Sequence, residues 1–520
     1  MATAATATAA AAVSRTFSFF WNNAIQHPPE PQVRDGEVTV FLQPRRFARF
    51  AGVFTLVPLL PKRPPTKQLP TEVWRRILSI LIDEGEEDDG PIISKAWLGR
   101  PTAGGNSLAT SEERSHNATF KWNLALVSKE FKDIALPILY AHCHIASLNS
   151  LRLFVTHLST SDQKWDSIRR IPYSSPGRWV QSLDVSRLTT STHQERFTAD
   201  DLLTRVFPLL PFLSRLELSL TLQLSRRAMH VLGTREGAAS LRSLKGVKYD
   251  SYAAAPQEPS GHRQRTFVPN DPLTELIRNC PSLEELEVVG LGLDDLDVMI
   301  AEDNIMARNE LLNSHSPTSL HLPNLRSLTL LSTPTSDLLL RLIHAQLPSL
   351  TNLIITPYGD IPSPLSLITP FLAAHGSKLR TLVLFTPKSW PTVIYPPPSD
   401  LLLLAPNLLA LSLEKVRLSL NPPPPPPLTA KGTPVPGTGH PLKELWIALP
   451  TVDLREAVVT LLPVLPNLRR VRARETRWAK KGMSARALEA GYQGEMRSWR
   501  RVLARFKVRM LDADGRESGL

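Results

Sequence analysis

Residues 322–330 read LPNLRSLTL, and variants of this stretch return along most of the chain. Its last six residues follow the pattern Leu-x-x-Leu-x-aliphatic, in which the fourth and sixth positions alternate like a short strand with one buried face. Stacked units of this kind share one continuous core, because a single unit cannot bury its apolar face alone. Ten such hexads begin at residues 180, 213, 241, 283, 325, 350, 379, 408, 442 and 468.

Apolar stretches between the hexads, such as 336–346 and 454–465, are typical of helices. The pattern resembles leucine-rich repeats, and the resemblance implies an α/β solenoid with one strand and one helix per unit. The asparagine that this family usually carries at the ninth position is replaced by Thr221, Leu291, Thr333 and Tyr358. We therefore expect an irregular solenoid over 147–475. It is interrupted by insertions at about 249–272, 291–321 and 419–441, the last with a run of prolines typical of a surface loop or an SH3-type ligand.

A compact helical unit is predicted ahead of the repeats. Residues 69–82 read LPTEVWRRILSILI, and their apolar positions recur at helical spacing after a proline suited to a first helical turn. Residues 122–145 share this periodicity as far as Pro137, which should break one helix and open another. The sequence thus predicts three short helices whose apolar surface exceeds one stripe.

These two segments together resemble the F-box, through Leu69-Pro70, Ile77 and Leu78 in the first and Val127, Phe131 and Tyr140 in the second. The resemblance implies a domain at 66–146 that docks onto the adaptor of an SCF-type cullin-RING ubiquitin ligase. An acidic and polar insertion at 83–121 replaces the short loop usual in the family. By this resemblance, the adaptor-binding residues are Leu69, Pro70, Val73, Ile77, Leu78, Leu81, Val127 and Phe131.

The chain is then expected to be a non-enzymatic substrate receptor whose repeats bind a protein target. Strand residues that alternate with the inward leucines should face a ligand, and the C-terminal repeats place aromatic and Arg side chains there. We expect these side chains to bind a target with an acidic or phosphorylated segment. For Trp446 an alternative stays open, in which the ring packs under a neighbouring loop. The candidate substrate-binding residues are Phe385, Glu414, Trp446, Arg470, Arg472 and Arg474.

The net charge of +12 is concentrated near the C-terminus, because 469–509 holds fourteen Lys or Arg and three acidic residues. Within 476–520, residues 495–511 predict a basic amphipathic helix. This helix could cap the last repeat, or it could bind nucleic acid or a membrane surface. Two alternatives to the ligase subunit therefore stay open: a repeat scaffold outside any ligase, and a binder that acts through this basic tail.

Other chemistry is sparse in the sequence. Cys143 and Cys280 form no disulfide framework, which favours a reducing compartment, cytoplasmic or nuclear. We find no phosphate-binding loop, nucleophile motif or transmembrane run, and we expect no cofactor. His142-Cys143-His144 lacks the second ligand cluster of a metal site. Residues 1–65 are expected to be weakly ordered, as an Ala/Thr tail or a transit peptide.

Overall fold

The computed structural model has two compact units, residues 1–73 and 74–520, and each is described by itself. The structure describes part of each unit, and the statements below concern those residues. They are residues 32–34, 37–40, 54–56, 69–83, 126–168, 176–249, 271–290, 320–333, 337–357, 367–387, 396–414, 420–421, 439–478 and 492–517.

The first unit contains a small antiparallel sheet of three strands. They are β1 (Gln32–Arg34), β2 (Glu37–Val40) and β3 (Phe54–Leu56), with β2 in the centre. Val38 pairs with Val33 on one side and with Leu56 on the other. No strand was expected in this part of the chain.

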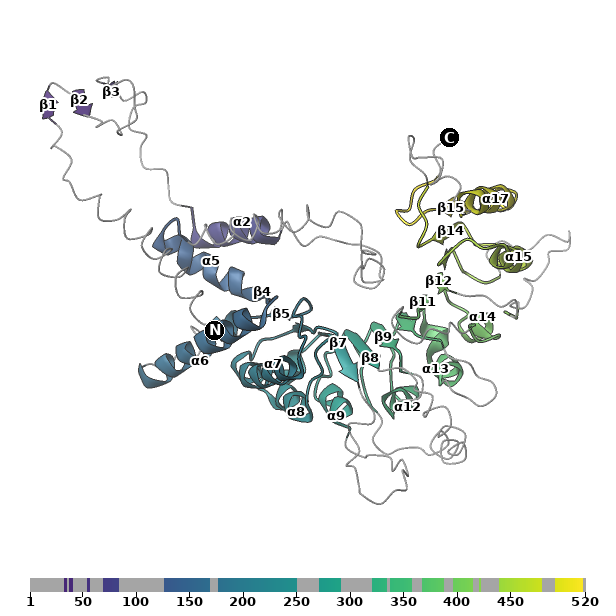
Figure 1. Ribbon diagram of the computed structural model, residues 1–520, viewed down its shortest axis with the longest axis horizontal. Coiled ribbons are helices and arrows are strands. Elements are labelled where there is room, and N and C mark those ends of the chain that lie inside the picture. The colour runs from purple at the N-terminus through teal and green to yellow at the C-terminus, as the bar shows by residue number, and fades with distance from the viewer. Residues whose placement is uncertain are drawn as a thin grey trace, which may run out of the picture. The chain divides into compact units, whose positions relative to one another are not determined.

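The second unit is built on a single twelve-stranded sheet in which every pairing is parallel, and each strand pairs with its neighbours in sequence (Figure 1). Parallel neighbours require a crossover connection, and the described helices α6 to α17 (residues 148–504) lie in such connections. The strands are β4 (His142–His144), β5 (Ser182–Asp184), β6 (Arg215–Glu217), β7 (Ser243–Tyr249), β8 (Glu285–Gly290), β9 (Ser327–Leu331), β10 (Asn352–Ile355), β11 (Thr381–Leu384), β12 (Ala410–Leu413), β13 (Glu444–Ile447), β14 (Arg470–Ala473) and β15 (Arg509–Leu511).

Helices line one side of this sheet, as Figure 1 shows for α7 to α17. Side-chain caps begin several of them; at α7, Thr192 and Glu195 form a reciprocal capping box. The helices are α6 (Leu148–Ile168), α7 (His193–Val206), α8 (Arg226–Thr234), α9 (Pro272–Arg278), α12 (Asp337–Ile343), α13 (Ile368–His375), α14 (Leu401–Leu404), α15 (Val452–Leu461) and α17 (Tyr492–Ala504). Short 3-10 turns lie at Pro176–Trp179, Phe207–Leu209, Ala238–Ser240, Gly376–Lys378 and Leu462–Val464.

The core lies between sheet and helices and runs through the unit from Ile145 to Met510. The fourth and sixth positions of the hexads supply its strand side, for example Leu328 and Leu330 in β9, which are almost completely buried. Full burial of one such side chain contributes about 1.5–3 kcal/mol. All ten hexads coincide with strands β5 to β14, so the predicted α/β repeat is confirmed, and its strands are parallel.

Two strands of this sheet were not predicted. β4 lies ahead of the first hexad and is separated from it by α6, and β15 lies where the sequence predicted a continuous helix over 495–511. That helix ends at Ala504, and Lys507 then adopts a left-handed φ of 61° that turns the chain back. Val508 and Met510 are therefore buried as alternate residues of an extended segment and not as a helical stripe.

The predicted break at Pro137 is also wrong. Helix α5 runs without interruption over Lys129–Ala141 and contains Pro137. Proline removes one backbone donor, and the carbonyl that loses it belongs to the exposed Asp133. Together with α2 (Thr71–Asp83), the described residues ahead of the sheet form two helices where three were expected. Among the described helices, none combines the length and apolar character needed to cross a bilayer.

Candidate functional site: a helix pair and the open face of the sheet

Trp74 and Leu78 of α2 pack against α5. The rings of Trp74 and Phe131 lie 4.9 Å apart between centroids, and Leu78, Ile134 and Ala135 form a small buried cluster. Helix α5 begins at a side-chain cap, because the Ser128 hydroxyl accepts a hydrogen bond from the Phe131 backbone N–H at 3.1 Å. This packing is local, and its core is separate from that of the repeats.

Large apolar side chains remain exposed on these two segments. Leu126 and Val127, just before α5, are 81% and 65% exposed, and Ile80 on α2 is 45% exposed. Leu69 and Val73, at the start of α2, are also exposed. Scattered exposed leucines are ordinary, but several within two short segments are typical of a protein-interaction surface.

The predicted adaptor-binding residues separate by exposure. Leu69, Pro70, Val73 and Val127 are exposed, Ile77 and Phe131 are half-buried, and the side chain of Leu81 lies outside the described residues. Leu78 is 1% exposed, so it stabilises the helix pair and is not accessible to a partner while the pair is packed. Leu126 and Ile80 were not among the predicted adaptor-binding residues, although the sequence places both apolar side chains next to predicted ones.

The open face of the sheet is the side opposite the helices, formed by residues that alternate with the core leucines. The pairing register aligns these residues in rows across the strands. One row runs Glu285, Ser327, Asn352, Thr381, Ala410, Glu444, Arg470 and Arg509. The next runs Glu287, Thr329, Ile354, Val383, Ser412, Trp446 and Arg472. The predicted substrate-binding residues of β13 and β14 therefore do lie on this face.

Phe385 and Trp446 occupy the predicted face but are buried, at 8% and 7% exposure. They belong to a second apolar cluster with Leu331, Ile354 and Val383. The alternative in which Trp446 packs against its surroundings matches this burial. In this conformation neither ring is free to act as an anchor for a partner.

Arg474 and Glu414 form a buried ion pair on the same face. The Arg474 Nη2 lies 3.7 Å from the Glu414 Oε1, and the two side chains are 4% and 8% exposed. The guanidinium lies 6.0 Å from the centroid of the Phe385 ring, and the Thr386 backbone N–H donates to the Glu414 Oε2 at 2.7 Å. Burial raises the pKa of Glu414 and lowers the pKa of Arg474, although each charge opposes the shift of the other.

Several polar atoms around this pair lack a hydrogen-bond partner. They are the Nε and Nη1 of Arg474 and the hydroxyl groups of Ser412, Thr386 and Thr476. Buried donors of this kind are costly when unpaired. The C-terminal part of the open face therefore has an unsatisfied polar centre beneath its surface.

The three arginines of β14 that were expected to face a ligand are largely paired with other groups. Arg470 is exposed but pairs with Glu444 at 3.0 Å. Arg472 is half-buried and donates to the carbonyl of Ala513, and Arg474 is buried with Glu414. Alternation along β14 placed the three arginines on one face correctly. It could not show their partners, which come from neighbouring strands and from the segment after β15.

The N-terminal part of the open face carries mixed charges. His144 and Asp184 pair through Nδ1 and Oδ2 at 2.9 Å, and Lys245 pairs with Glu285 at 2.8 Å. Partial burial opposes ionisation of Asp184, but hydrogen bonds from His144 and Ser186 together hold the pKa of that carboxyl below its usual value. These paired charges are suited to polar recognition.

Cys143 and Cys280 have no nucleophilic character here. Burial raises the pKa of Cys143 to about 12 and that of Cys280 to about 11, so both thiols are protonated at neutral pH. Cys143 lies in β4 and its Sγ donates to the Tyr140 carbonyl at 3.2 Å. Across the described residues, no group of three His, Cys, Asp or Glu side chains is placed to hold a metal ion.

The chain matches no protein-family model and no curated protein.

Proposed function

We propose that this chain is the substrate-recognition subunit of an SCF-type ubiquitin ligase, in which α2 and α5 dock the adaptor and the repeats bind a protein target. The chain performs no chemistry in this role. It raises the local concentration of a target beside a ubiquitin-loaded enzyme, so its contribution is proximity.

The observation that carries the proposal is the apolar surface of the helix pair. The pair buries Leu78, Ile134 and Ala135 but leaves Leu126, Val127 and Ile80 exposed. A pair that served only as a lid for the repeats would bury these side chains internally. The same segments carry the F-box-like pattern, so the pattern and the exposure both favour docking of the adaptor by α2 and α5.

The test is binding of the purified full chain to the purified SCF adaptor, measured by titration calorimetry. We expect Leu126→Ala/Val127→Ala to weaken binding by at least about tenfold, because truncation of a central apolar contact costs more than 1 kcal/mol. Leu69→Ala/Pro70→Ala should act in the same direction. A chain that lacks 84–119 should still bind, because the long insertion costs little closure entropy.

Leu153→Ala/Phe197→Ala is the matched control, because Leu153 on α6 and Phe197 on α7 are equally large and exposed. This variant should bind the adaptor like the wild type. A folded wild-type chain that fails to bind would overturn the ligase proposal and favour a repeat scaffold. Equal losses in the test and control variants would show that the effect is not specific to the helix pair.

The target would have an acidic or phosphorylated segment that reaches the rim of the open face at β14 and β15. Arg470 and Arg509 are adjacent in the sheet register and both are exposed. Phosphate exchanges readily into such exposed pairs because it offers more acceptor oxygens than one carboxylate. Capture of a phosphopeptide library should fall for Arg470→Ala and persist for Arg242→Ala, whose arginine is similarly exposed and pairs with Glu284.

A further inference from the structure

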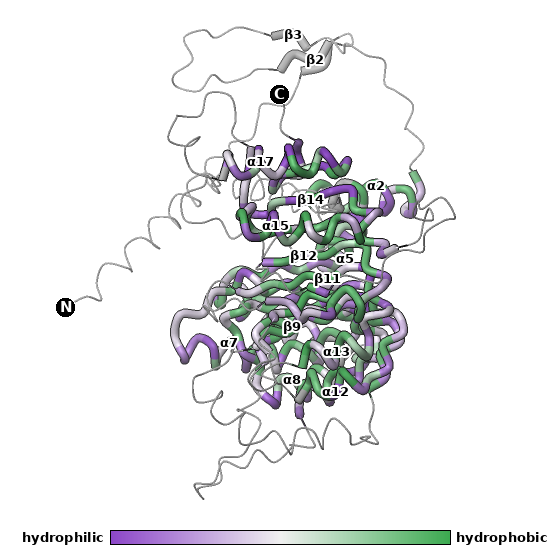
Figure 2. Tube along the Cα trace, turned by 90° about the vertical axis from the view of Figure 1, so that its right-hand side faces the viewer, coloured by the Kyte–Doolittle hydropathy of each residue, from purple (hydrophilic) through white to green (hydrophobic). Residues whose placement is uncertain are grey.

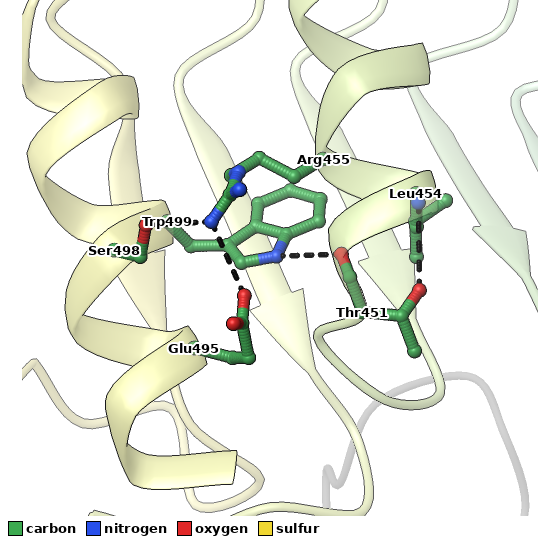
Figure 3. A network of polar contacts seen from close by, with 6 residues as sticks. All are labelled: Thr451, Leu454, Arg455, Glu495, Ser498 and Trp499. Carbon is green, nitrogen blue, oxygen red and sulfur yellow. Dashed lines mark hydrogen bonds and ion pairs between the residues drawn. The ribbon is translucent and has the colours of Figure 1, made fainter. Parts of the chain in front are cut away.

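The last helix, α17, is fixed to the repeat by its inner face (Figure 3). Met496, Trp499 and Leu503 are completely or almost completely buried. The Trp499 indole N–H donates to the Thr451 carbonyl at 3.1 Å. Arg455 on α15 contacts Glu495 at 3.2 Å and the Ser498 hydroxyl at 2.5 Å. These contacts set the rotation of the helix about its axis.

The opposite side of α17, together with the turn that follows it, is basic. Residues 497–507 contain five Arg or Lys and no acidic residue. Arg497, Arg501 and Arg505 follow one another at four-residue spacing and are exposed, and so is Lys507. The Cα trace in Figure 2 accordingly alternates between hydrophilic and hydrophobic residues along α17. We name this set, with Arg500 at its flank, the α17 basic face.

The charges of the α17 basic face have no acidic partner among the described residues, although ion pairs are formed around it by Arg455 and Arg509. Cations near a helix C-terminus stabilise it by only a few tenths of a kcal/mol each. Helix stability therefore explains one or two of these residues and not five. A row of unpaired cations is a surface complementary to a row of anions.

We propose that the α17 basic face binds the phosphate backbone of a nucleic acid. This site does not depend on the proposed ligase function, because it lies on the helix side of the sheet. Membrane insertion requires a free apolar face, and in α17 that face is buried in the core. An acidic protein partner needs several apolar anchors beside the charges, and among the described residues 497–507 only Phe506 is an exposed large apolar side chain. A phosphate backbone needs only cations in series.

The test is fluorescence anisotropy of the full-length protein with labelled single-stranded and duplex oligonucleotides, between about 50 and 200 mM salt. We expect Arg497→Gln/Arg501→Gln/Arg505→Gln to weaken binding at least tenfold at low salt. The slope of log K against log salt should fall by about 2 to 3, because three phosphate contacts are lost. The corresponding Lys triple variant should retain most of the binding, because cations in series are sufficient.

Arg152→Gln/Arg196→Gln/Arg278→Gln removes the same charge from exposed positions on α6, α7 and α9 and should bind like the wild type. Circular dichroism checks that each variant is folded. Equal weakening in both Gln triples, or none in either, would overturn the proposal. So would preferential binding of the wild type to vesicles with phosphatidylserine or to a polyglutamate peptide, measured in the same buffers.

Discussion

The ion pair of Arg474 and Glu414 decides whether the open face presents a positive charge at this point. The pair crosses a strand, from β14 to the end of β12, and the intervening residue is the small Ala448, whose backbone N–H bonds to Leu413. The charge that was expected to face a ligand is thereby held inside.

We predict that Glu414→Ala lowers the free energy of unfolding by about 3–5 kcal/mol, because it leaves Arg474 buried without its counter-charge. Glu444→Ala removes a partner of the exposed Arg470 and should cost less than about 1 kcal/mol. Urea unfolding followed by tryptophan fluorescence measures both. Similar values for the two variants would contradict a buried pair.

Two buried histidines predict a stability that depends on pH. Burial lowers the pKa of His375 and of His440 from the ordinary value of 6.5. Both donate from Nε2 to a carbonyl, Leu342 for His375 and Ala405 for His440. Below pH 6.5 the two imidazoles bind protons in the unfolded chain but stay neutral in the folded chain. The stability that they contribute above that pH is therefore lost as the pH falls.

We therefore expect the free energy of unfolding to fall between about pH 7 and 5, and to fall less steeply in His375→Gln/His440→Gln. His230→Gln, at an exposed position, is the control and should keep the wild-type slope. Denaturant titrations at several pH values measure the slopes. A double variant with an unchanged slope would show that other groups dominate.

At the scale of the element, α17 and β15 close the end of the repeat. The sequence indicated an amphipathic helix here through Trp499 and Leu503, and both side chains are buried. It did not indicate the strand, because Val508 and Met510 provide only two alternating positions. A period of two is not distinguishable from a helical stripe over so short a length.

We predict that Trp499→Ala costs about 3–5 kcal/mol, because a fully buried indole and its hydrogen bond to Thr451 are removed together. Phe506→Ala, on the exposed side of the same segment, should cost less than about 0.5 kcal/mol. Thermal unfolding of both variants shows which substitution lowers the stability more. Equal effects would mean that α17 is not packed on α15.

Two glycines give opposite expectations. Gly246 lies in the irregular part of β7 with φ 72°, and a Cβ there would lie 2.2 Å from the Leu218 carbonyl oxygen. Gly246→Ala should destabilise by about 1–3 kcal/mol. Gly494 in α17 has open space around it, so Gly494→Ala should stabilise by up to about 1 kcal/mol. Urea titrations decide the sign of each change.

At the scale of the molecule, the sequence predicted the sheet better than the candidate binding surfaces. The pattern that contains Leu328 and Leu330 occurs in ten hexads along the chain, so the prediction of the sheet rests on many independent copies. Burial of Phe385 or pairing of Arg474 depends on residues from other strands, and no local pattern encodes these contacts. The helix pair shows the same limit, since the spacing placed Leu78 on an apolar helix face but did not show that it is buried against Ile134 and Ala135 of α5.

A repeat of this kind should unfold from its ends. Each strand of the sheet pairs only with its neighbours in sequence, so stability is carried by nearest-neighbour interfaces. We expect amide protection in native-state hydrogen exchange to be highest in β8 to β12 and lowest in β4 and β15. Uniform protection across all strands would indicate a single cooperative unit.

The sequential strand order has a consequence for how the chain is made. A strand that leaves the ribosome finds its partner already emerged, so pairing never waits for a distant segment of the polypeptide. Among the described strands of this sheet, β15 is the last to emerge, and it pairs with β14. Each nascent chain therefore carries one exposed growing edge, and a premature stop codon before residue 492 would release a protein with that edge still uncovered.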